Sequence, residues 1–328
     1  MGYKAEKEKI EKKISVIKIV VLCVVLAIVL GLCVFSAFCP PATWKYYVKK
    51  PKVDKRKDGE MRIHFLDVGQ GDCTLIELPD GKIALVDGGD TTETTTETVL
   101  RYLNKLKIKT IDYLIVTHSD SDHCGSLETV VEQKEILNAY LPATKPENEG
   151  VTYAGLYAEL LEEKCPLTYS SRAVNLSGDG YTFTFLYPRS LETEDLDYYD
   201  GSSAVIWLDY KGASAILMGD EPVSTESLLI TDSKAGILKK YGVDLQSTEI
   251  LKVGHHGSAT STSLEFLQYL NVQTAVISCG ENNPYGHPTK EVLGNIEAAP
   301  ASVYRTDHHG TVMVTVKADG KCKVETAK

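Results

Sequence analysis

Residues 117–127, with the sequence THSDSDHCGSL, constrain the fold of this chain more than any other segment. They place His118, Asp120, Asp122 and His123 within six residues, directly after an apolar run. An apolar run followed by small and polar residues predicts a buried strand that ends in a loop. At the end of a strand the backbone can arrange four side chains around one point, which neither a helix face nor a continuing strand would allow.

Two imidazoles and two carboxylates in one turn predict a metal site. Such side chains bind borderline divalent ions such as zinc or manganese, and four of them this close together indicate two ions. We therefore predict that His118, Asp120, Asp122 and His123 are metal ligands. The alternative is a polar loop or helix N-cap, with Asp122 capping a helix that begins near Gly125. That alternative explains one such residue more easily than four.

The first 58 residues differ in composition from the rest of the chain. Residues 19–39 are 21 residues without a charge, which matches the ~20 that a helix needs to cross a bilayer. The run is longer than the apolar region of a signal peptide and ends without a good cleavage site, so we predict an uncleaved anchor. The predicted boundaries are a lysine-rich tail at 1–18, a transmembrane anchor at 19–39, a basic linker at 40–58 and one folded domain at 59–328.

Lysines lie on both sides of the apolar run, so the positive-inside rule separates the two orientations only weakly. We predict a single-pass protein of the cell membrane, with its N-terminus inside and the domain outside the cell. The eight cysteines show no Cys-x-x-Cys spacing, and those outside the apolar run are odd in number, which does not indicate a disulfide framework. Cys124 is read as a small buried thiol rather than a ligand.

The domain is strongly acidic. Residues 59–328 contain 22 Lys and Arg against 40 Asp and Glu, a net charge of −18, whereas the whole chain carries −10. This charge argues against tight sequence-independent binding of nucleic acid, which depends on many contacts between Lys or Arg and phosphates. It is compatible with a phosphodiester substrate that is held chiefly by metal ions.

The apolar pattern predicts two successive blocks of strands, each followed by strand–helix units. The predicted strands are 61–67, 73–78, 82–87, 111–117, 138–143, 181–187, 203–210, 213–218, 249–253, 274–278, 303–304, 311–316 and 321–325. The predicted helices are 91–109, 127–137, 153–164, 223–241, 262–270 and 289–298. Because polar residues fall repeatedly at strand ends, we expect an α/β (α+β) fold, a four-layer αββα sandwich with the site at one edge between the sheets.

Asp220 and His255 occupy the same setting as the first loop, since each ends an apolar strand beside a glycine. No histidine occurs between His123 and His255, so the later strands must complete a metal site. We predict that Asp220 bridges two ions, that His255 is the late ligand and that His256 acts beside it. The last two could exchange roles, because adjacent residues that leave a strand point in opposite directions. A turn aspartate is the alternative for Asp220.

Two more acidic residues, Asp72 and Asp87, lie at strand or turn ends. Asp87 precedes a glycine pair, which suggests a buried carboxylate that orients the metal-binding loop from behind. The alternative is an ordinary turn aspartate. Asp72 is a candidate for shaping the site or for binding a metal.

Seven segments in order resemble the metallo-β-lactamase-fold domain of ComEC-type competence proteins. They are FLDVGQGDCTLI (65–76), LVDGG (85–89), THSDSDHCGSL (117–127), MGD (218–220), LKVGHHGSATSTS (251–263), YGHP (285–288) and VYRTDHHG (303–310). The resemblance covers nearly all of residues 61–328. It implies a dinuclear hydrolase site made of His118, Asp120, Asp122, His123, Asp220 and His255.

The chain departs from that family in two respects. The middle-strand histidine of the wider superfamily is missing, and Asp200-Gly201-Ser202-Ser203 stands where ComEC-like sequences have Asn-x-x-Ser. Asp200 either replaces that ligand or only forms hydrogen bonds, and Ser203 belongs to the same candidate group. In addition, the family carries a multi-pass channel region, whereas this chain has one predicted span, so it cannot itself form a DNA-conducting pore.

The expected function is a membrane-anchored hydrolase that uses two zinc or manganese ions and no nucleotide cofactor. A phosphoester is the predicted substrate, with DNA as one candidate. We assign Asp122 to orienting the attacking water, and His256 and His287 to stabilising charge or protonating the leaving oxygen; His287 has a structural role as its alternative. Hydrolysis of an ester, lactone or lactam and a non-catalytic DNA-uptake assembly module are the competing functions. The oligomeric state is left open.

Overall fold

The computed structural model describes residues 2–38, 40–49, 51–144, 149–172, 174–190 and 203–328. The chain divides into two units, Met1–Lys49 and Lys50–Lys328, and each is described by itself. Residues 50–58, at the end of the predicted basic linker, group with the second unit, and Val53 is buried there.

The first unit contains the helix α1 (Gly2–Phe38) and the short 3-10 helix η1 (Pro41–Tyr47). Within the described residues, α1 is the one helix that is long and apolar enough to cross a membrane, over Glu6–Ala37. Its aliphatic side chains are exposed; Leu30, for example, is 66% exposed. Length and composition therefore make α1 a candidate membrane span, and the predicted lysine-rich tail belongs to the same helix.

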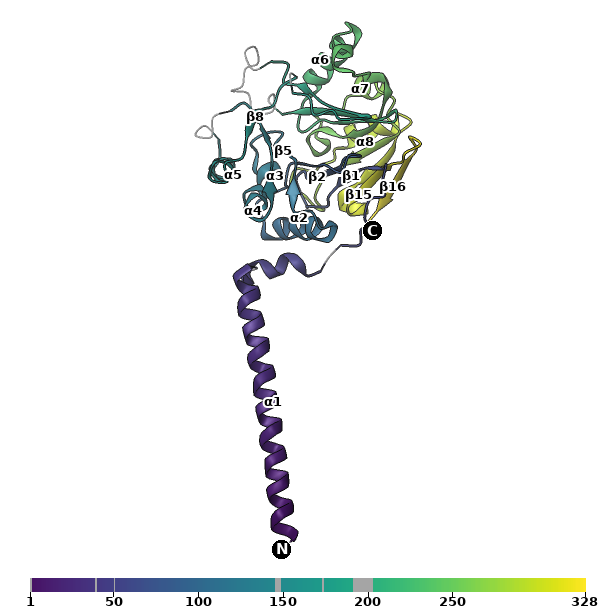
Figure 1. Cartoon of the computed structure of the whole chain (residues 1–328). Coiled ribbons are helices and arrows are strands. Elements are labelled where there is room, and N and C mark those ends of the chain that lie inside the picture. Colours follow the sequence, from purple (N-terminus) through teal and green to yellow (C-terminus); the bar gives the residue numbers. More distant parts are fainter. Residues whose placement is uncertain (1, 39, 50, 145–148, 173, 191–202) are drawn as a thin grey trace. The chain divides into compact units, whose positions relative to one another are not determined.

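The described strands of the second unit form two large sheets (Figure 1). The eight-stranded sheet has the order β16 (Cys322–Thr326), β15 (Val312–Val316), β1 (Met61–Phe65), β2 (Thr74–Glu77), β3 (Ile83–Val86), β5 (Tyr113–Ile115), β7 (Ala139–Leu141) and β8 (Leu167–Tyr169). The six-stranded sheet has the order β14 (Ser302–Arg305), β13 (Thr274–Ile277), β12 (Thr248–Lys252), β11 (Ala213–Leu217), β10 (Val205–Tyr210) and β9 (Tyr181–Tyr187). The short strands β4 (Thr110–Ile111) and β6 (Glu135–Ile136) pair separately.

The two sheets pack face to face because alternate side chains along their strands point to the same face, and the apolar side chains on the two facing surfaces form one core. Met61, Ile63 and Phe65 of β1 enter one hydrophobic core together with Phe183 and Phe185 of β9. The intervening residues of β1 therefore point to the opposite face of the sheet. A second core lies between the six-stranded sheet and its helices.

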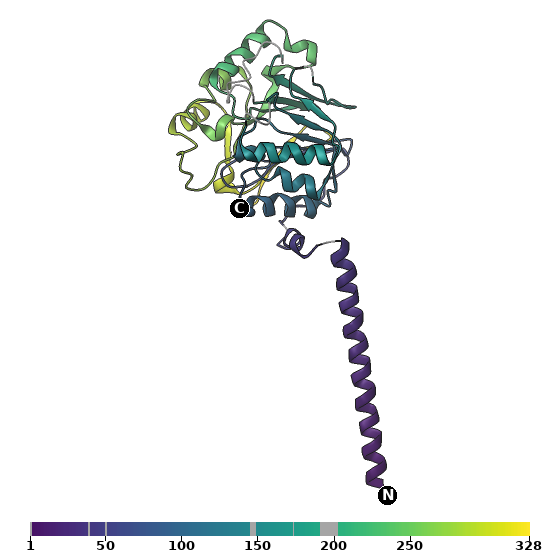
Figure 2. The same ribbon diagram turned by 90° about the vertical axis from the view of Figure 1, so that its left-hand side faces the viewer.

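Helices cover the outer faces. The eight-stranded sheet is covered by α2 (Glu93–Leu106), α4 (Leu127–Gln133) and α5 (Val151–Glu162), which lie side by side in Figure 2. The six-stranded sheet is covered by α6 (Val223–Lys234), α7 (Leu264–Tyr269) and α8 (Lys290–Glu297). Two one-turn helices, α3 (Ser121–Cys124) and α9 (Thr306–His309), occupy loops. This arrangement is the predicted αββα sandwich.

Two predicted helices end earlier in the structure than predicted, and one strand of the large sheet was not predicted. The helix predicted over 223–241 ends at Lys234, because Gly236 adopts a positive φ of 72°, and the 3-10 helices η4 (Leu238–Tyr241) and η5 (Leu245–Ser247) follow. The helix predicted over 127–137 ends at Gln133, because β6 pairs with β4. Strand β8 was not predicted.

Parallel pairing brings the polar strand ends together. Strands β3 and β5 run parallel in one sheet, and β11, β12 and β13 run parallel in the other. The carboxyl ends of parallel neighbours meet at the same edge of a sheet. The loops that follow β3, β5, β11 and β12, which contain Asp87, His118, Asp220 and His255, therefore emerge together.

Candidate metal centre

The loop after β5 presents its imidazoles inward and its carboxylates outward. His118 and His123 are buried, and their ring centroids lie 4.0 Å apart. The side chains of Asp120 and Asp122 remain partly exposed. Asp120 begins the one-turn helix α3, which returns His123 toward His118. Asp120 is the N-cap residue of α3, Asp122 lies inside that helix, and Ser126 is the N-cap residue of α4, so the alternative in which Asp122 caps a helix is wrong.

Asp220 lies at the centre of the site. Its carboxylate oxygens are 3.2 Å from Nε2 of His123, 3.6 Å from Nε2 of His255, 3.7 Å from Nε2 of His256 and 3.9 Å from Nε2 of His118. These four histidines come from the loops of both sheets. The convergence of the two halves of the domain, which the sequence predicted, is present in the structure.

Several buried polar atoms at this point have no hydrogen bond within the described part of the chain. They are Nε2 of His118, His123 and His256 and one oxygen each of Asp72 and Asp220. Buried polar groups normally have a partner, so orphaned atoms aimed at one space fit a cation. Ligand atoms of Asp72, His123, Asp220 and His256 all lie within 4.8 Å of one another. The donor set of imidazoles and carboxylates suits a divalent ion.

Asp87 contacts the loop from behind. It is buried, and it accepts hydrogen bonds from the backbone N–H of Thr117 (2.8 Å) and from the Thr117 hydroxyl (2.7 Å). Its carboxylate also lies 2.9 Å from Nδ1 of His123, which leaves Nε2 of that ring toward Asp220. A carboxylate behind a histidine fixes the orientation and tautomer of the ring.

Ser203 joins the two halves of the site. Its hydroxyl oxygen is 3.4 Å from Nδ1 of His118 and accepts a hydrogen bond of 3.1 Å from the backbone N–H of Asp220. Gly219 has a positive φ of 53°, and a Cβ there would lie 2.2 Å from that oxygen. Asp200, the other candidate from this segment, lies outside the described residues.

His255 and His256 point to different places, as adjacent residues with positive φ values of 47° and 52° in the 3-10 turn η6 (Gly254–Gly257). The His256 side chain is 2% exposed, whereas that of His255 is 27% exposed. Nδ1 of His256 is 3.0 Å from the Ser278 carbonyl oxygen, and its Nε2 is 3.2 Å from Asp122. Of the two assignments that the sequence left open, the geometry favours His256 as the buried ligand and His255 at the mouth.

Lys252 is a residue that the sequence analysis missed. It ends β12, it is only 2% exposed, and its ammonium group pairs with the buried carboxylate of Asp72. The other oxygen of Asp72 lies 3.4 Å from Nδ1 of His256. The available signal was a lysine between the apolar residues Leu251 and Val253, because a charge buried there needs a partner.

Burial and the neighbouring charges lower the pKa of some groups in the site and raise the pKa of others. Burial, together with the neighbouring His123, lowers the pKa of His118 to about 3. Burial also opposes the charged form of His256, but Asp220 and Asp72 outweigh it and raise the pKa of His256 to about 9. The pKa of the Asp220 carboxyl is lowered well below its usual range despite burial, because His123 and His256 lie beside it. The carboxylates that attract these protons are the groups that would attract a cation.

His287 lies at the mouth, near His255. The ring centroids of the two histidines are 5.7 Å apart, and the ring of Tyr285 stacks on that of His287 at 5.8 Å. The Asn283 side chain bonds both the backbone N–H and the carbonyl of His287, which fixes its place. Nδ1 of His287 is buried without a hydrogen bond among the described residues.

Residues 66–281 match the family model of the metallo-β-lactamase superfamily, which is more than half of the chain. The chain belongs to the metallo-β-lactamase superfamily. It is 31% identical over 277 residues to ComE operon protein 3 of Bacillus subtilis (strain 168), covering 79% of this chain and 33% of that protein. It is 30% identical over 256 residues to competence protein ComA of Neisseria gonorrhoeae, covering 78% of this chain and 32% of that protein.

This metallo-β-lactamase-fold chain thus spans about a third of the length of those relatives. Their names confirm the resemblance to ComEC-type competence proteins that the sequence motifs indicated. Among solved structures, a variant of the CmlA β-hydroxylase aligns with a TM-score of 0.50 at 12% identity, covering 80% of this chain and 54% of that one. That likeness supports the fold alone.

A tight backbone contact in this metallo-β-lactamase site generates the first prediction. Gly71 has a φ of 133°, and a Cβ there would lie 2.3 Å from the carbonyl oxygen of Asp122, whereas a Cβ at Gly69 (φ 81°) would meet nothing within 4 Å. We expect Gly71→Ala to lower the thermal midpoint and the bound metal content clearly. Gly69→Ala should cost only backbone strain, about 1 kcal/mol. Equal effects of both changes on metal content would contradict this role for the contact.

The Lys252–Asp72 pair generates the second prediction. Lys252→Met leaves a buried carboxylate without its cation, so we expect a loss of about 3–5 kcal/mol in the free energy of unfolding. Metal affinity should fall roughly 10- to 100-fold. Without Lys252 the Asp72 carboxylate is no longer fixed in the position from which it orients His256. Adding Asp72→Asn to Lys252→Met should restore stability without restoring metal affinity. Denaturant unfolding and metal titration measure both, and recovery of metal affinity in the double variant would contradict the orienting role.

Proposed function

We propose that the chain is a membrane-anchored, metal-dependent phosphodiesterase. The observation that carries the proposal is the Asp220 carboxylate, which lies within 4 Å of imidazole nitrogens from four histidines of both sheets. A carboxylate in such a position can be shared between two cations. The superfamily fold and the buried Asp/His cluster support divalent metal binding.

Two ligand groups would meet at Asp220, each holding zinc or manganese. The first group consists of His118 and Asp120, and the second of Asp122, His123 and His256. A bound pair of such ions lowers the pKa of water toward ~7 and polarises the oxygens of an ester. Asp72 serves to orient His256 rather than to bind an ion, because Lys252 holds one of its oxygens.

The side chains at the open side of the site have distinct tasks. Asp122 is partly exposed, and one of its oxygens can hold a water for attack and accept its proton. His255 and His287 face each other at the mouth, where an N–H can donate to the leaving oxygen or to a developing charge. His256, to which the sequence analysis gave this task, is too buried for it and acts as a ligand.

A phosphodiester is the favoured substrate class because two histidines, His255 and His287, lie together at the mouth. Imidazole N–H groups suit the charged oxygens of a phosphate better than the acyl chain of an ester. The similarity to competence proteins supports DNA as one candidate substrate. We further propose that α1 anchors the chain in the cell membrane with the domain outside the cell.

The third prediction tests the chemistry with the full chain in detergent. We expect two divalent ions per chain by elemental analysis, and metal-dependent cleavage of bis-p-nitrophenyl phosphate or single-stranded DNA. Asp220→Asn should lose most bound metal and at least about a hundredfold in kcat/KM, because it removes the shared carboxylate. His287→Gln should keep its metal and lose about 10- to 100-fold in kcat. His308→Gln, an exposed histidine outside the site, is the matched control.

The outcomes separate the candidate functions. Cleavage of an ester, lactone or lactam with phosphodiesters left intact would contradict the substrate class but keep the metal centre. A chain that holds no metal yet binds DNA would contradict the hydrolase and favour a non-catalytic assembly module.

A further inference from the structure

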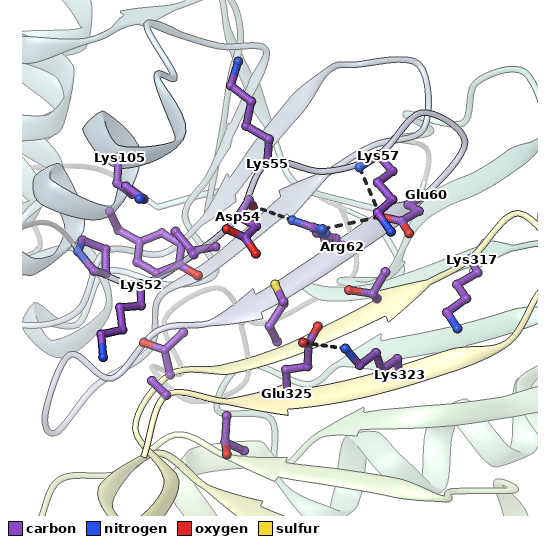
Figure 3. Close-up of a pocket in the computed structure, with 18 residues that line it drawn as sticks. Lys52, Asp54, Lys55, Lys57, Glu60, Arg62, Lys105, Lys317, Lys323 and Glu325 are labelled. Atoms are coloured by element: carbon purple, nitrogen blue, oxygen red, sulfur yellow. Dashed lines mark hydrogen bonds and ion pairs between the residues drawn. The ribbon is translucent and has the colours of Figure 1, made fainter.

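We propose that a basic groove on the outer face of the eight-stranded sheet binds the phosphate head group of an anionic phospholipid. The groove has a volume of about 950 Å³ and is lined by the segment 51–57, by α2 and by strands β1, β15 and β16. Figure 3 shows Lys52, Lys55, Lys57, Lys105, Lys317 and Lys323 around it, with Arg62 on its floor. This inference is independent of the hydrolase chemistry.

The floor contains two buried polar groups that lack partners. Arg62 of β1 and Thr315 of β15 are register neighbours, and they are 6% and 4% exposed. Nε of Arg62 and the hydroxyl oxygen of Thr315 are both without a hydrogen bond among the described residues. A phosphate oxygen can accept from a guanidinium N–H and from a hydroxyl, so the pair fits an anion.

The rest of the Arg62 guanidinium is held in place. One terminal nitrogen donates to the carbonyl oxygen of Asp54 (2.7 Å), and the other lies 3.5 Å from the Glu60 carboxylate. Glu77 is 4.0 Å away. The side chain is therefore fixed, while its Nε–H stays unpaired.

The rim adds positive charge that is not neutralised locally. No carboxylate lies within 4 Å of the ammonium groups of Lys52, Lys55, Lys57, Lys105 and Lys317 in the described parts of the chain, whereas Lys323 pairs with Glu325 at 2.6 Å. Basic side chains outnumber acidic ones around the groove by seven to three. Because residues 59–328 carry a net charge of −18, this basic excess contrasts with the domain as a whole and favours an anion at the groove.

Chain connectivity favours a lipid as the source of the phosphate. Pro51, at one end of the groove, follows the last residue of α1 by a short stretch that spans at most roughly 45 Å at ~3.5 Å per residue. If α1 crosses the bilayer, a tether of this length lets the lysines reach its surface. Lysines beside an anionic membrane surface contribute about 1 kcal/mol each.

A long polyanion fits the surroundings less well. At Thr311 the groove adjoins a second hollow, since the Asp67 N–H bonds the Thr311 hydroxyl. That hollow is lined by Asp67, Glu281 and Asp307 and by one cation, Lys328, which pairs with Asp67, so it lacks the excess of basic side chains that a nucleic acid strand continuing beyond the groove would need. The head group of a phospholipid is compact and would end before this second hollow.

The test uses the full chain in neutral detergent micelles, with phosphatidylglycerol, phosphatidylcholine, inorganic phosphate or a 20-nucleotide single strand as the probe. Thermal unfolding at increasing probe concentration gives apparent affinities. We expect phosphatidylglycerol to stabilise the chain and phosphatidylcholine not to. Lys317→Gln/Lys323→Gln should weaken phosphatidylglycerol binding at least about tenfold. Lys239→Gln/Lys240→Gln, with the same charge change on η4, should leave it unchanged.

Thr315→Val distinguishes a hydrogen bond at the floor of the groove from the general attraction of its lysines. The change removes one hydroxyl and alters neither the charge nor, to any great extent, the shape of the side chain. It should weaken phosphatidylglycerol binding about threefold to tenfold. Equal effects of phosphatidylglycerol and phosphatidylcholine, or of groove and control variants, would overturn the proposal. So would stabilisation by inorganic phosphate or by the oligonucleotide in the absence of a response to phosphatidylglycerol, since either would assign the groove to a different ligand.

Discussion

Charge compensation at the edge between the two sheets is the constraint on which the rest of this structure depends. Asp72, Asp87 and Asp220 are buried, and each lies against a cationic or titratable side chain rather than water. A buried carboxylate is costly unless it is paired or binds a metal. The neighbouring imidazoles and Lys252 offset part of this charge, and the unbonded atoms that remain around Asp220 are where cations would supply the rest.

The fold meets this constraint by fixing the site from behind. Asp87 holds His123, Ser203 holds His118 and Asp220, and the Ser278 carbonyl holds His256. Asp87 and Ser278 directly follow β3 and β13, and Ser203 lies just before β10, so residues beside strand ends determine the directions of these three rings. Preorganisation of this kind lets a site bind ions or stabilise charge without paying for rearrangement at the moment of reaction.

The sequence predicted the parts of the site that depend on local pattern. Polar residues after apolar strands beside glycine located the loops of Asp87, His118 and Asp220, and the alternation of apolar residues predicted the sandwich. The roles of His255 and His256 depended on two consecutive positive φ values, which residue type alone does not reveal. Lys252 was missed because its partner, Asp72, is 180 positions away in the chain, and a strand pattern contains no information about that pairing.

The position of Lys252 also bears on how firmly the ligands of a divalent ion would be oriented. The positive charge of Lys252 beside the metal centre opposes metal binding by repulsion. Another effect of the lysine must therefore offset this repulsion. By pairing with one oxygen of Asp72, it removes that carboxylate from the pool of ligands and leaves the other oxygen to face Nδ1 of His256. The imidazole then keeps Nε2 toward Asp122 and Asp220. A buried lysine thus favours a metal site of fixed geometry over a looser cluster of carboxylates that would accept ions without fixed geometry.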